Sequence, residues 1–221
     1  PVDVMNVINV EKPLGVVVAF GGGTAIKLAK YLDEQGIKIL GTSADAIDLA
    51  EDRERFDELC EKLEVNRPKG LTILTEVEAL EAAAKLGYPV LMRPSYVLGG
   101  QNMIIARSSA DIKEYMKIIL AQKIENPILI DKYMEGLELE IDCICDGKDV
   151  LIPGIMQHVE RTGIHSGDSI AVYPTYSFTQ EMTDIVVKKS TDMALALGTQ
   201  GLVNIQWLFY NGQLNIIEAN P

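Results

Sequence analysis

The chain has 221 residues, of which 48% are hydrophobic and 24% are charged. A chain of this length and composition can bury its own core, so we exclude a disordered protein and a small domain held together by disulfides or metals. Its 32 acidic residues outnumber the 20 basic ones and give a net charge of −12, which disfavours non-specific binding to nucleic acid or anionic lipid.

No feature of the sequence predicts a membrane or secreted location, and we expect a cytoplasmic protein. The longest apolar run, Val16–Phe20, has about five residues, whereas a membrane-spanning helix needs about 20. The first residues show neither the basic segment nor the apolar stretch of a secretory signal. Three cysteines, Cys60, Cys143 and Cys145, form no C-x-x-C motif, so we expect buried reduced thiols rather than disulfides or a zinc site.

In the first third of the chain, short apolar runs alternate with helical patterns. Val16–Phe20 is predicted to be a buried strand, Thr24–Gln35 a helix and Ile37–Leu40 a second strand, which together make one βαβ unit. A further helix is expected over Arg53–Leu63. The polar segment Asn66–Gly70, which contains Pro and Gly, then breaks the chain.

The middle of the chain has the pattern of a small α+β module. A helix is predicted near Thr75–Leu86 and a strand at Val90–Met92, followed by a glycine-containing loop at 94–102 and another strand. The helix that comes next carries one apolar stripe, formed by Ile112, Tyr115, Met116, Ile119 and Leu120.

The last third is mostly β structure. Apolar and polar residues alternate in Leu137–Cys145, Leu202–Phe209 and Leu214–Ala219, and one helix is expected near Gln180–Leu197. The fold class is therefore a combination of α/β and α+β. We expect three subdomains, over residues 1–66, 67–134 and 135–221.

Two glycine-containing segments could hold an anion. Gly21–Thr24 lies between a predicted strand and helix, where backbone N–H groups bind anions, but it matches no nucleotide fingerprint and an ordinary tight turn is the alternative. Arg93 precedes a loop in which Gly99 and Gly100 would let the backbone approach a phosphate closely. Arg53 could supply a second cation. For both arginines the alternative is a solvated surface charge.

The strand Leu137–Cys145 carries a row of carboxylates. Because strand side chains alternate, Glu138, Glu140 and Asp142 point away from the apolar residues between them. Such a row can bind ribose hydroxyls or a cation. The alternative is an ordinary half-exposed strand.

The last two strands form a hairpin whose register decides which polar residues meet. A two-residue turn at Asn211-Gly212 would place Gln206 and Glu218 on opposite faces of the sheet. We expect instead a three-residue loop that starts at Tyr210 and pairs Gln206 with Ile216. This register brings four polar residues onto one face: Asn204, Gln206, Glu218 and Asn220. The core face would then hold Val203, Ile205, Trp207, Ile217 and Ala219.

A carboxylate flanked by amides on one sheet face is an oxygen-rich site of the kind that binds Mg²⁺. Pairing among buried polar groups is the alternative. Of the two histidines, His158 and His165, the second lies in a loop rich in glycine and serine, so it either contacts a ligand or is structural. A Ser/His/Asp hydrolase is disfavoured, since the sequence has no G-x-S-x-G motif.

Six motifs follow one another along the chain: E-D-R-E-R-F at 51–56, R-P-S-Y-V-L-G-G at 93–100, L-E-L-E-I-D at 137–142, G-I-H-S-G-D-S at 163–169, L-V-N-I-Q at 202–206 and I-I-E-A-N-P at 216–221. Together they resemble the ATP-grasp family and, more narrowly, the large subunits of carbamoyl phosphate synthetases. The 93–100 and 163–169 motifs are more similar to the C-terminal half of those subunits, which phosphorylates carbamate, than to the half that phosphorylates bicarbonate. The implied fold is two α+β subdomains that clasp ATP, preceded by part of a βαβ subdomain.

The resemblance also implies a nucleotide site. Its positions in this sequence are Arg53, Arg93, Gly99, Gly100, Asp131, Lys132, Met134, Glu138, Gly163, Ile164, His165, Ser166, Gln206 and Glu218. The two arginines would hold the ATP phosphates, Lys132 and Met134 would line the adenine, and Glu138 would bind the ribose hydroxyls. The implied ligands of Mg²⁺ or Mn²⁺ are Gln206, Glu218 and Asn220, with K⁺ as a further cation. The implied catalytic residues are Arg93, Glu218 and Asn220.

The implied reaction is attack of a carbamate oxygen on the γ-phosphorus of ATP, which yields carbamoyl phosphate. Positioning and charge neutralisation do most of the work in phosphoryl transfer, which agrees with a site of arginines, glycines and metal ligands. In the intact enzyme a small glutamine amidotransferase subunit would supply ammonia, and the product would enter pyrimidine and arginine synthesis.

Two departures from the family pattern matter. Gly23 stands where the family usually has glutamine in G-G-Q-T, and the sequence stops at Pro221, where the family continues with R-x-x-R. We therefore expect a fragment that binds Mg²⁺ and adenine nucleotide with little or no turnover.

Three other functions compete with this interpretation. Another ATP-grasp ligase or carboxylase would be favoured by lysines in place of Arg53 and Arg93. A non-catalytic nucleotide-binding module fits the missing R-x-x-R segment. A dinucleotide-binding dehydrogenase is disfavoured, because no G-x-G-x-x-G motif occurs.

Overall fold

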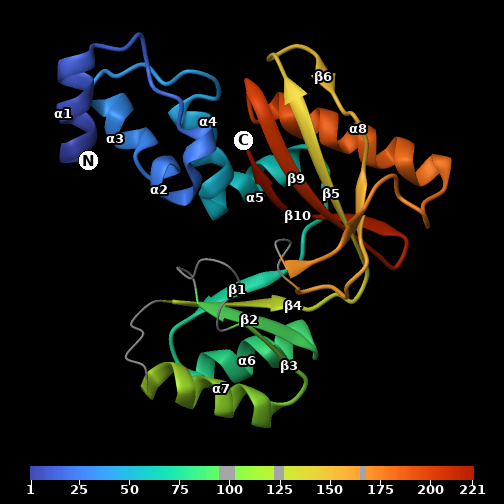
Figure 1. The fold of residues 1–221 in the computed structure, drawn as a ribbon. Coiled ribbons are helices and arrows are strands. Elements are labelled where there is room, and N and C mark those ends of the chain that lie inside the picture. The colour runs from blue at the N-terminus through green and yellow to red at the C-terminus, as the bar shows by residue number, and fades with distance from the viewer. Residues whose placement is uncertain (95–102, 122–126, 165–167) are drawn as a thin grey trace.

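Three buried hydrophobic clusters organise the protein, for which a computed structural model describes residues 1–94, 103–121, 127–164 and 168–221. One cluster joins the N-terminal helices, the second lies beneath a small sheet, and the third lies beneath a larger sheet. Figure 1 shows the N-terminal helices and the two sheets. This arrangement confirms the mixed α/β and α+β class. The subdomain boundaries after residues 66 and 134 stay predictions.

The regular elements of the N-terminal part are helices. Its elements are α1 (Val2–Glu11), η1 (Ala19–Gly21), α2 (Gly22–Ile26), α3 (Ala29–Glu34) and α4 (Ala44–Glu51). The expected strand–helix–strand unit is only partly right. Val16 pairs in parallel with Ile39, and its N–H donates to the Lys38 carbonyl at 2.8 Å, but no longer strand forms among these residues.

Local turns explain the two differences in this part. The expected strand does not extend beyond the bridge at Val16, because the chain turns after Val18 into the 3₁₀ helix η1, where Gly21 N–H donates to the Val18 carbonyl at 3.1 Å. The expected single helix over Thr24–Gln35 is interrupted where Leu28 N–H donates to the Ala25 carbonyl at 3.0 Å. Such a bond, to the third residue back, tightens the helical turn and separates α2 from α3.

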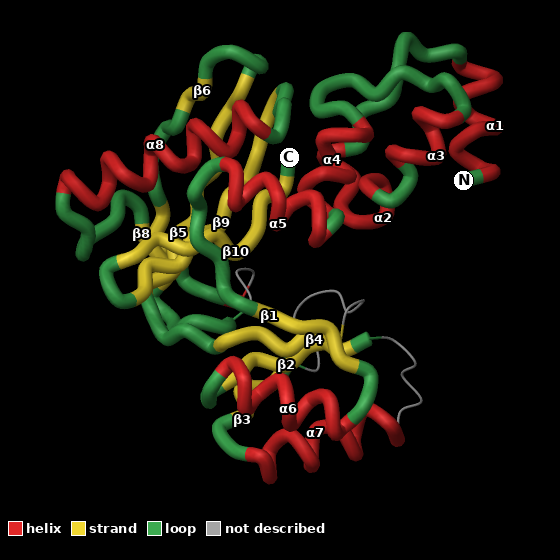
Figure 2. The backbone as a smooth tube through the Cα atoms, turned by 180° about the vertical axis from the view of Figure 1, so that it is seen from behind, coloured by secondary structure: helices red, strands yellow, loops and turns green. Residues whose placement is uncertain are grey.

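The small sheet is antiparallel, with strand order β1-β4-β2-β3. Its strands are β1 (Gly70–Ile73), β2 (Val90–Pro94), β3 (Ile104–Ala106) and β4 (Ile128–Lys132). Helices α6 (Glu76–Leu86) and α7 (Ser109–Ala121) cover the face turned away from the larger sheet (Figures 1 and 2). Four residues of the predicted α7 stripe are buried there: Ile112, Tyr115, Met116 and Ile119.

Helix α6 begins at a capping box, which explains why its start was predictable. The Thr75 hydroxyl accepts from Glu78 N–H at 3.2 Å, and the Glu78 carboxylate accepts from Thr75 N–H at 3.1 Å. These two bonds satisfy N–H groups that a helix start leaves without partners. Because side chains alternate along β2 and β4, Arg93 and Asp131 lie on the face opposite α6 and α7.

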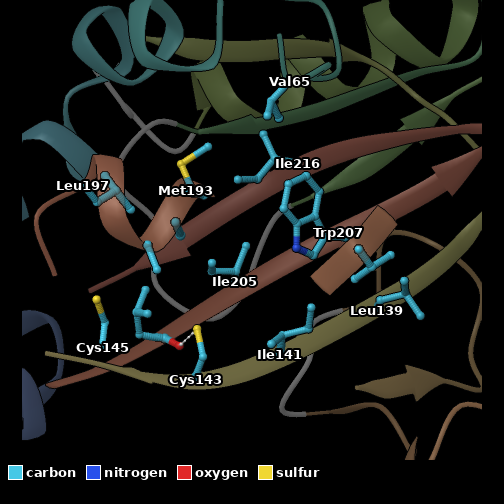
Figure 3. Packing of buried hydrophobic residues seen from close by; sticks show 14 of the residues in the cluster. Val65, Leu139, Ile141, Cys143, Cys145, Met193, Leu197, Ile205, Trp207 and Ile216 are labelled. Carbon is cyan, nitrogen blue, oxygen red and sulfur yellow. Dashed lines mark hydrogen bonds between the residues drawn. The ribbon is translucent and has the colours of Figure 1, made fainter. Parts of the chain in front are cut away.

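The large sheet has the order β10-β9-β5-β7-β8, and β6 pairs with β5. Its strands are β5 (Leu137–Cys145), β6 (Val150–Leu151), β7 (Met156–His158), β8 (Ala171–Val172), β9 (Gly201–Tyr210) and β10 (Gln213–Asn220). Helices α5 (Arg53–Lys62) and α8 (Gln180–Ala196) pack on one face, around the buried Trp207 (Figure 3). The carboxylates and amides of β5, β9 and β10 therefore occupy the other face.

The indole of Trp207 gives a direct test of this core. Its Nε1–H donates to the Ser190 hydroxyl of α8 at 2.9 Å, and both residues are fully buried. Replacing Ser190 with alanine leaves that donor without its partner, so we expect the free energy of unfolding to fall by about 1–3 kcal/mol. Urea unfolding measures it. Thr183→Ala, which removes a half-buried hydroxyl from the same helix, is the control and should change it less.

The hairpin register is corrected by the structure. The turn has two residues, Asn211 and Gly212, whose φ values of 49° and 76° suit a two-residue hairpin turn, so the expected three-residue loop is wrong. The extra residue lies in β10 instead, at a bulge between Ile216 and Glu218. Glu218 thus pairs with Gln206 despite the short turn.

The bulge also changes which residue enters the core. Ile216 is 1% exposed and packs in the third cluster, whereas Ile217, which we expected there, is 38% exposed. The prediction that Asn204, Gln206, Glu218 and Asn220 share a face is confirmed, since Asn220 Nδ2 contacts Asn204 Oδ1 at 3.5 Å and Glu218 Oε1 at 3.2 Å. A bulge of one residue in β10 shifts which side chains point to each face of the sheet, just as a hairpin loop longer by one residue would.

The cysteines confirm the expectation of buried thiols. Cys60, Cys143 and Cys145 are buried free thiols, and burial raises the pKa of Cys60 and Cys143 to about 11. Within the described ranges, every helix is too short or too polar to cross a bilayer.

Candidate functional site

Two arginines from different elements converge on one carboxylate. Arg53 Nη2, from the first turn of α5, lies 3.4 Å from Asp131 Oδ1, and Arg93 Nε, from β2, lies 3.6 Å from Asp131 Oδ2. The arginine side chains stay 39% and 46% exposed, whereas that of Asp131 is 14% exposed. Two guanidinium groups with one counter-charge leave a net positive site that an anion can reach.

Gly70 makes this arrangement possible. It lies opposite Asp131 in the β1–β4 pairing, and a Cβ atom built on it would overlap the Asp131 carboxylate and the Arg53 guanidinium. Burial raises the pKa of Asp131, while the charges of Arg93 and Arg53 oppose that rise. Both arginines were predictable from the sequence, whereas Gly70 was not, because its role depends on a cross-strand neighbour.

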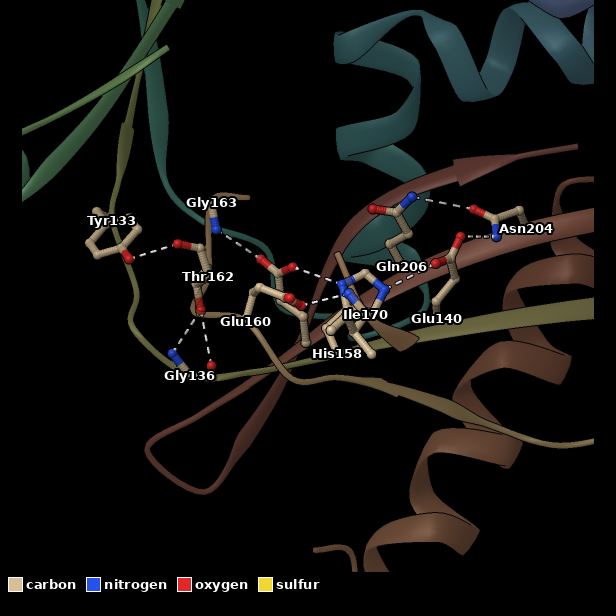
Figure 4. Close-up of polar contacts among 11 residues, drawn as sticks. Tyr133, Gly136, Glu140, His158, Glu160, Thr162, Gly163, Ile170, Asn204 and Gln206 are labelled. Atoms are coloured by element: carbon tan, nitrogen blue, oxygen red, sulfur yellow. Dashed lines mark hydrogen bonds and ion pairs between the residues drawn. The ribbon is translucent and has the colours of Figure 1, made fainter. Parts of the chain in front are cut away.

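The carboxylate row of β5 meets a buried histidine. His158 Nε2 lies 3.0 Å from Glu140 Oε2, and His158 Nδ1 lies 3.3 Å from Glu138 Oε2 without hydrogen-bond alignment. The amide of Asn204 in β9 donates to Glu140 Oε1 at 2.8 Å (Figure 4). It also donates to Asp142 Oδ1 at 2.8 Å. The predicted row therefore exists, and it is held from both neighbouring strands.

His158 is a site residue that was not predicted from the sequence, because its importance comes from the pairing of β7 with β5. Its side chain is only 3% exposed. Burial raises the pKa of Glu138, and the Gly163 N–H and the neighbouring His158 oppose that rise. Glu138 is thus a buried carboxylate whose ionised form depends on a few fixed partners.

The raised pKa of Glu138 predicts a pH-dependent stability change. A carboxylate whose pKa is higher in the folded than in the unfolded state stabilises the fold at low pH, and this contribution is lost as pH rises through the folded pKa. We expect Glu138→Gln to gain stability relative to the unaltered chain between about pH 4 and pH 8, starting near the ordinary glutamate pKa. Urea unfolding at both pH values measures this change, with the exposed Glu114→Gln of α7 measured beside it. A difference that is constant or shrinks as pH rises contradicts the prediction.

The segment between the two sheets, residues 133–136, is bonded to the loop at 160–164. The Tyr133 hydroxyl donates to the Thr162 carbonyl at 2.7 Å, and the Thr162 hydroxyl bonds both the N–H and the carbonyl of Gly136 at 3.0 Å (Figure 4). Gly163 N–H then donates to Glu138 Oε1 at 3.1 Å. Gly163 has φ 90°, a conformation that side chains disfavour.

The polar face of β9 and β10 gathers oxygen ligands. Gln206, Glu218 and Asn220 share this face with Asn204, whose Oδ1 accepts from Gln206 Nε2 at 3.5 Å. One carboxylate with neighbouring amide oxygens is the donor set that Mg²⁺ binds, so these residues fit the predicted ion. Along residues 1–94, 103–121, 127–164 and 168–221, this face included, no group of three or more His, Cys, Asp or Glu could hold a metal, so the predicted site depends on amide oxygens beside a single carboxylate.

Other predicted site residues are placed less directly. Lys132 Nζ donates to the carbonyls of Gly87 and Tyr88 at 2.8 and 3.1 Å, so its ammonium binds the backbone that follows the C-terminal end of α6. Met134 and Ile164 are half-buried. Gly99, Gly100, His165 and Ser166 lie outside the described residues, and their predicted roles stay predictions.

One open pocket, of about 570 Å³, lies between α5, the segment 64–71 and the end of α6. Arg53 and Gly70 reach it, but the carboxylate row and the β9–β10 face do not line it. Most of the polar groups of the candidate site therefore lie outside this pocket.

Comparisons with known proteins match the whole length of the chain. A family described as carbamoyl-phosphate synthase L chain, ATP binding domain, matches residues 52–221, and carbamoyl phosphate synthase preATP-grasp domain matches residues 1–49. The carbamoyl phosphate synthase large chain of Lachnoclostridium phytofermentans is 53% identical over 221 residues, which are 100% of this chain and 21% of that protein. The chain spans about a fifth of the length of the curated relatives it matches.

Solved structures share the fold at much lower identity. A biotin carboxylase from Campylobacter jejuni, described as a β-γ-ATP complex, gives a TM-score of 0.77 at 17% identity, over 98% of this chain and 50% of that one. The biotin carboxylase domain of a Hydrogenobacter thermophilus 2-oxoglutarate carboxylase, solved with MgADP, ADP and bicarbonate, gives 0.77 at 21% identity, over 99% and 50%. These likenesses confirm the predicted ATP-grasp fold.

Proposed function

The chain belongs to the carbamoyl-phosphate synthase large-chain family, through its ATP-binding domain, and on this premise we propose that it holds MgATP for the phosphorylation of carbamate. One observation carries the proposal: two half-exposed arginines share a single carboxylate beside the face of the small sheet that α6 and α7 leave uncovered. Such paired guanidinium groups recognise phosphate in a bidentate manner.

Each part of the site has a proposed task. Arg53 and Arg93 bind the phosphate oxygens and counter the negative charge that phosphoryl transfer redistributes. Glu138, with its buried carboxylate, accepts hydrogen bonds from the ribose hydroxyls. Lys132 and Met134 line the adenine, Lys132 through its backbone, because its ammonium is bound to the carbonyls at the end of α6.

The metal would be held by Gln206, Glu218 and Asn220. When bound there, Mg²⁺ would neutralise phosphate charge and orient the γ-phosphoryl group for in-line attack. Mn²⁺ is an alternative at the same oxygens, and K⁺ is a further proposed cation. Arg93, Glu218 and Asn220 are the proposed catalytic residues, and they act by binding and positioning.

The partners in a longer enzyme are proposals of the same kind. A small glutamine amidotransferase subunit would supply ammonia, and the carbamate formed from bicarbonate and ammonia would receive the phosphoryl group. For the 221-residue chain itself we propose binding of magnesium nucleotide with little or no turnover.

Calorimetric titration of MgADP into the chain tests the proposal, with MgGDP as the comparison ligand. We expect saturable binding of MgADP and weaker binding of MgGDP. A coupled assay for ATP formed from ADP and carbamoyl phosphate measures turnover. Failure to bind either nucleotide at millimolar concentration would overturn the proposal for this chain, and fast ATP formation would overturn the statement about turnover.

A further inference from the structure

The Thr162 hydroxyl makes an unusual pair of bonds. It donates to the Gly136 carbonyl and accepts from the Gly136 N–H, each at 3.0 Å, so one buried side chain satisfies both backbone groups of a residue in the segment between the sheets. The Tyr133 hydroxyl adds a third bond, to the Thr162 carbonyl at 2.7 Å. The backbone at Thr162 is therefore fixed from three directions.

The next residue connects this fixed point to the candidate ribose carboxylate. Gly163 N–H donates to Glu138 Oε1 at 3.1 Å, and a Cβ atom built on Gly163 would lie 3.4 Å from the Tyr133 ring. Because the Gly163 amide belongs to the peptide unit that carries the Thr162 carbonyl, any rotation of that unit moves the N–H away from Glu138.

We propose that Thr162 is a positioning residue for the nucleotide: by holding the 162–163 peptide unit, it aims the Glu138 carboxylate at the ribose hydroxyls. This inference rests on the proposed nucleotide site and assigns within it a residue that does not itself need to touch the ligand. Glu138 needs such support because its other close partner, His158, is shared with Glu140 and reaches Glu138 without hydrogen-bond alignment.

Two substitutions separate the hydroxyl from the shape of the side chain. Thr162→Val keeps the shape and removes both bonds to Gly136, whereas Thr162→Ser keeps the hydroxyl. We expect Thr162→Val to weaken MgADP binding about three- to tenfold, the effect of one lost hydrogen bond, and Thr162→Ser to restore most of it. Binding of Mg-2′,3′-dideoxy-ADP, which lacks the ribose hydroxyls, should be the same in all three proteins.

A nucleotide-independent measurement keeps the inference separate from the proposed function. We expect the Gly163 amide to exchange its hydrogen faster in Thr162→Val than in the unaltered chain, with or without nucleotide. If the unaltered chain binds no nucleotide, the proposed function fails, and faster exchange then shows only that the peptide unit is held. The positioning role is overturned by unchanged exchange, by unchanged MgADP affinity, or by equal weakening for the dideoxy nucleotide.

A double-substitution cycle completes the test. If Thr162 acts through Glu138, Thr162→Val should add little to the loss caused by Glu138→Gln, whereas additive losses would contradict the inference. Should Thr162→Val fail to fold, Tyr133→Phe replaces it, because this variant removes the bond to the Thr162 carbonyl and should weaken MgADP binding in the same selective way.

Discussion

Replacing Arg93 with alanine is expected to weaken MgADP binding about ten- to hundredfold. The side chain is 46% exposed, and among the described residues its only carboxylate partner is Asp131, which it shares with Arg53. Its guanidinium therefore has donors left for phosphate oxygens. Hydrogen bonds between charged groups contribute about 1.5–3 kcal/mol, which corresponds to this range of affinity. Calorimetric titration measures the change. Arg93→Lys should recover only part of the loss, since lysine keeps the charge without the forked geometry.

Two further variants define the origin of that loss. Lys117→Ala removes a positive charge from α7, on the far face of the small sheet, and should leave MgADP affinity unchanged. Gly70→Ala keeps every charge but inserts a Cβ atom into the Asp131–Arg53 contact, so it should weaken binding in the same direction. Equal losses in Arg93→Ala and Lys117→Ala would indicate a general effect of net charge and contradict a phosphate site.

The site consists of two polar faces whose side chains are oriented by neighbours from other elements. Asp131 orients two arginines, and His158 and Asn204 hold the carboxylate row from the strands on either side of β5. Preorganised groups of this kind act on phosphate without having to rearrange during the reaction. This is why residues that contact no ligand, such as Gly70 and Thr162, are expected to affect binding.

Much of the fold follows from hydrophobic periodicity. The strand Leu137–Cys145 has the predicted bounds, and the helices that begin at Arg53, Glu76 and Gln180 lie where helical spacing predicted them. These elements have a two- or 3.6-residue pattern and bury residues of one face in a hydrophobic cluster, so local and tertiary preferences agree. The prediction of an N-terminal strand was wrong, because a short apolar run does not distinguish a strand from a tight helical turn.

The hairpin of β9 and β10 shows what the alternation of apolar and polar residues cannot predict. Ile216 and Ile217 are adjacent and equally apolar, so the sequence does not reveal which of them enters the core or where an extra residue is placed. A longer loop and a bulge give the same face for Gln206 and Glu218, which is why the grouping was predictable while the register was not. His158 escaped prediction for a related reason, since only the β5–β7 pairing brings it to Glu138 and Glu140.

Replacing Glu218 with alanine is expected to raise the Mg²⁺ concentration needed for half-maximal nucleotide binding by at least about tenfold. Glu218 is the one charged residue among the three proposed ligands, and on β10 it is exposed on the polar face beside Gln206 and Asn220. Titrating Mg²⁺ at fixed ADP measures this concentration. Glu218→Gln, which keeps an oxygen but removes the charge, should lie between the alanine variant and the unaltered chain.

The metal dependence distinguishes a ligand from a structural residue. Binding of ADP in the presence of a chelator should be the same in Glu218→Ala and in the unaltered chain, because the lost carboxylate acts through the ion. Glu114→Gln, an exposed carboxylate on α7, should behave as the unaltered chain in both titrations. An unchanged Mg²⁺ requirement would remove Glu218 from the metal site. Equal weakening of binding with and without the ion would assign it a direct contact with the nucleotide or a structural role in the β9–β10 hairpin.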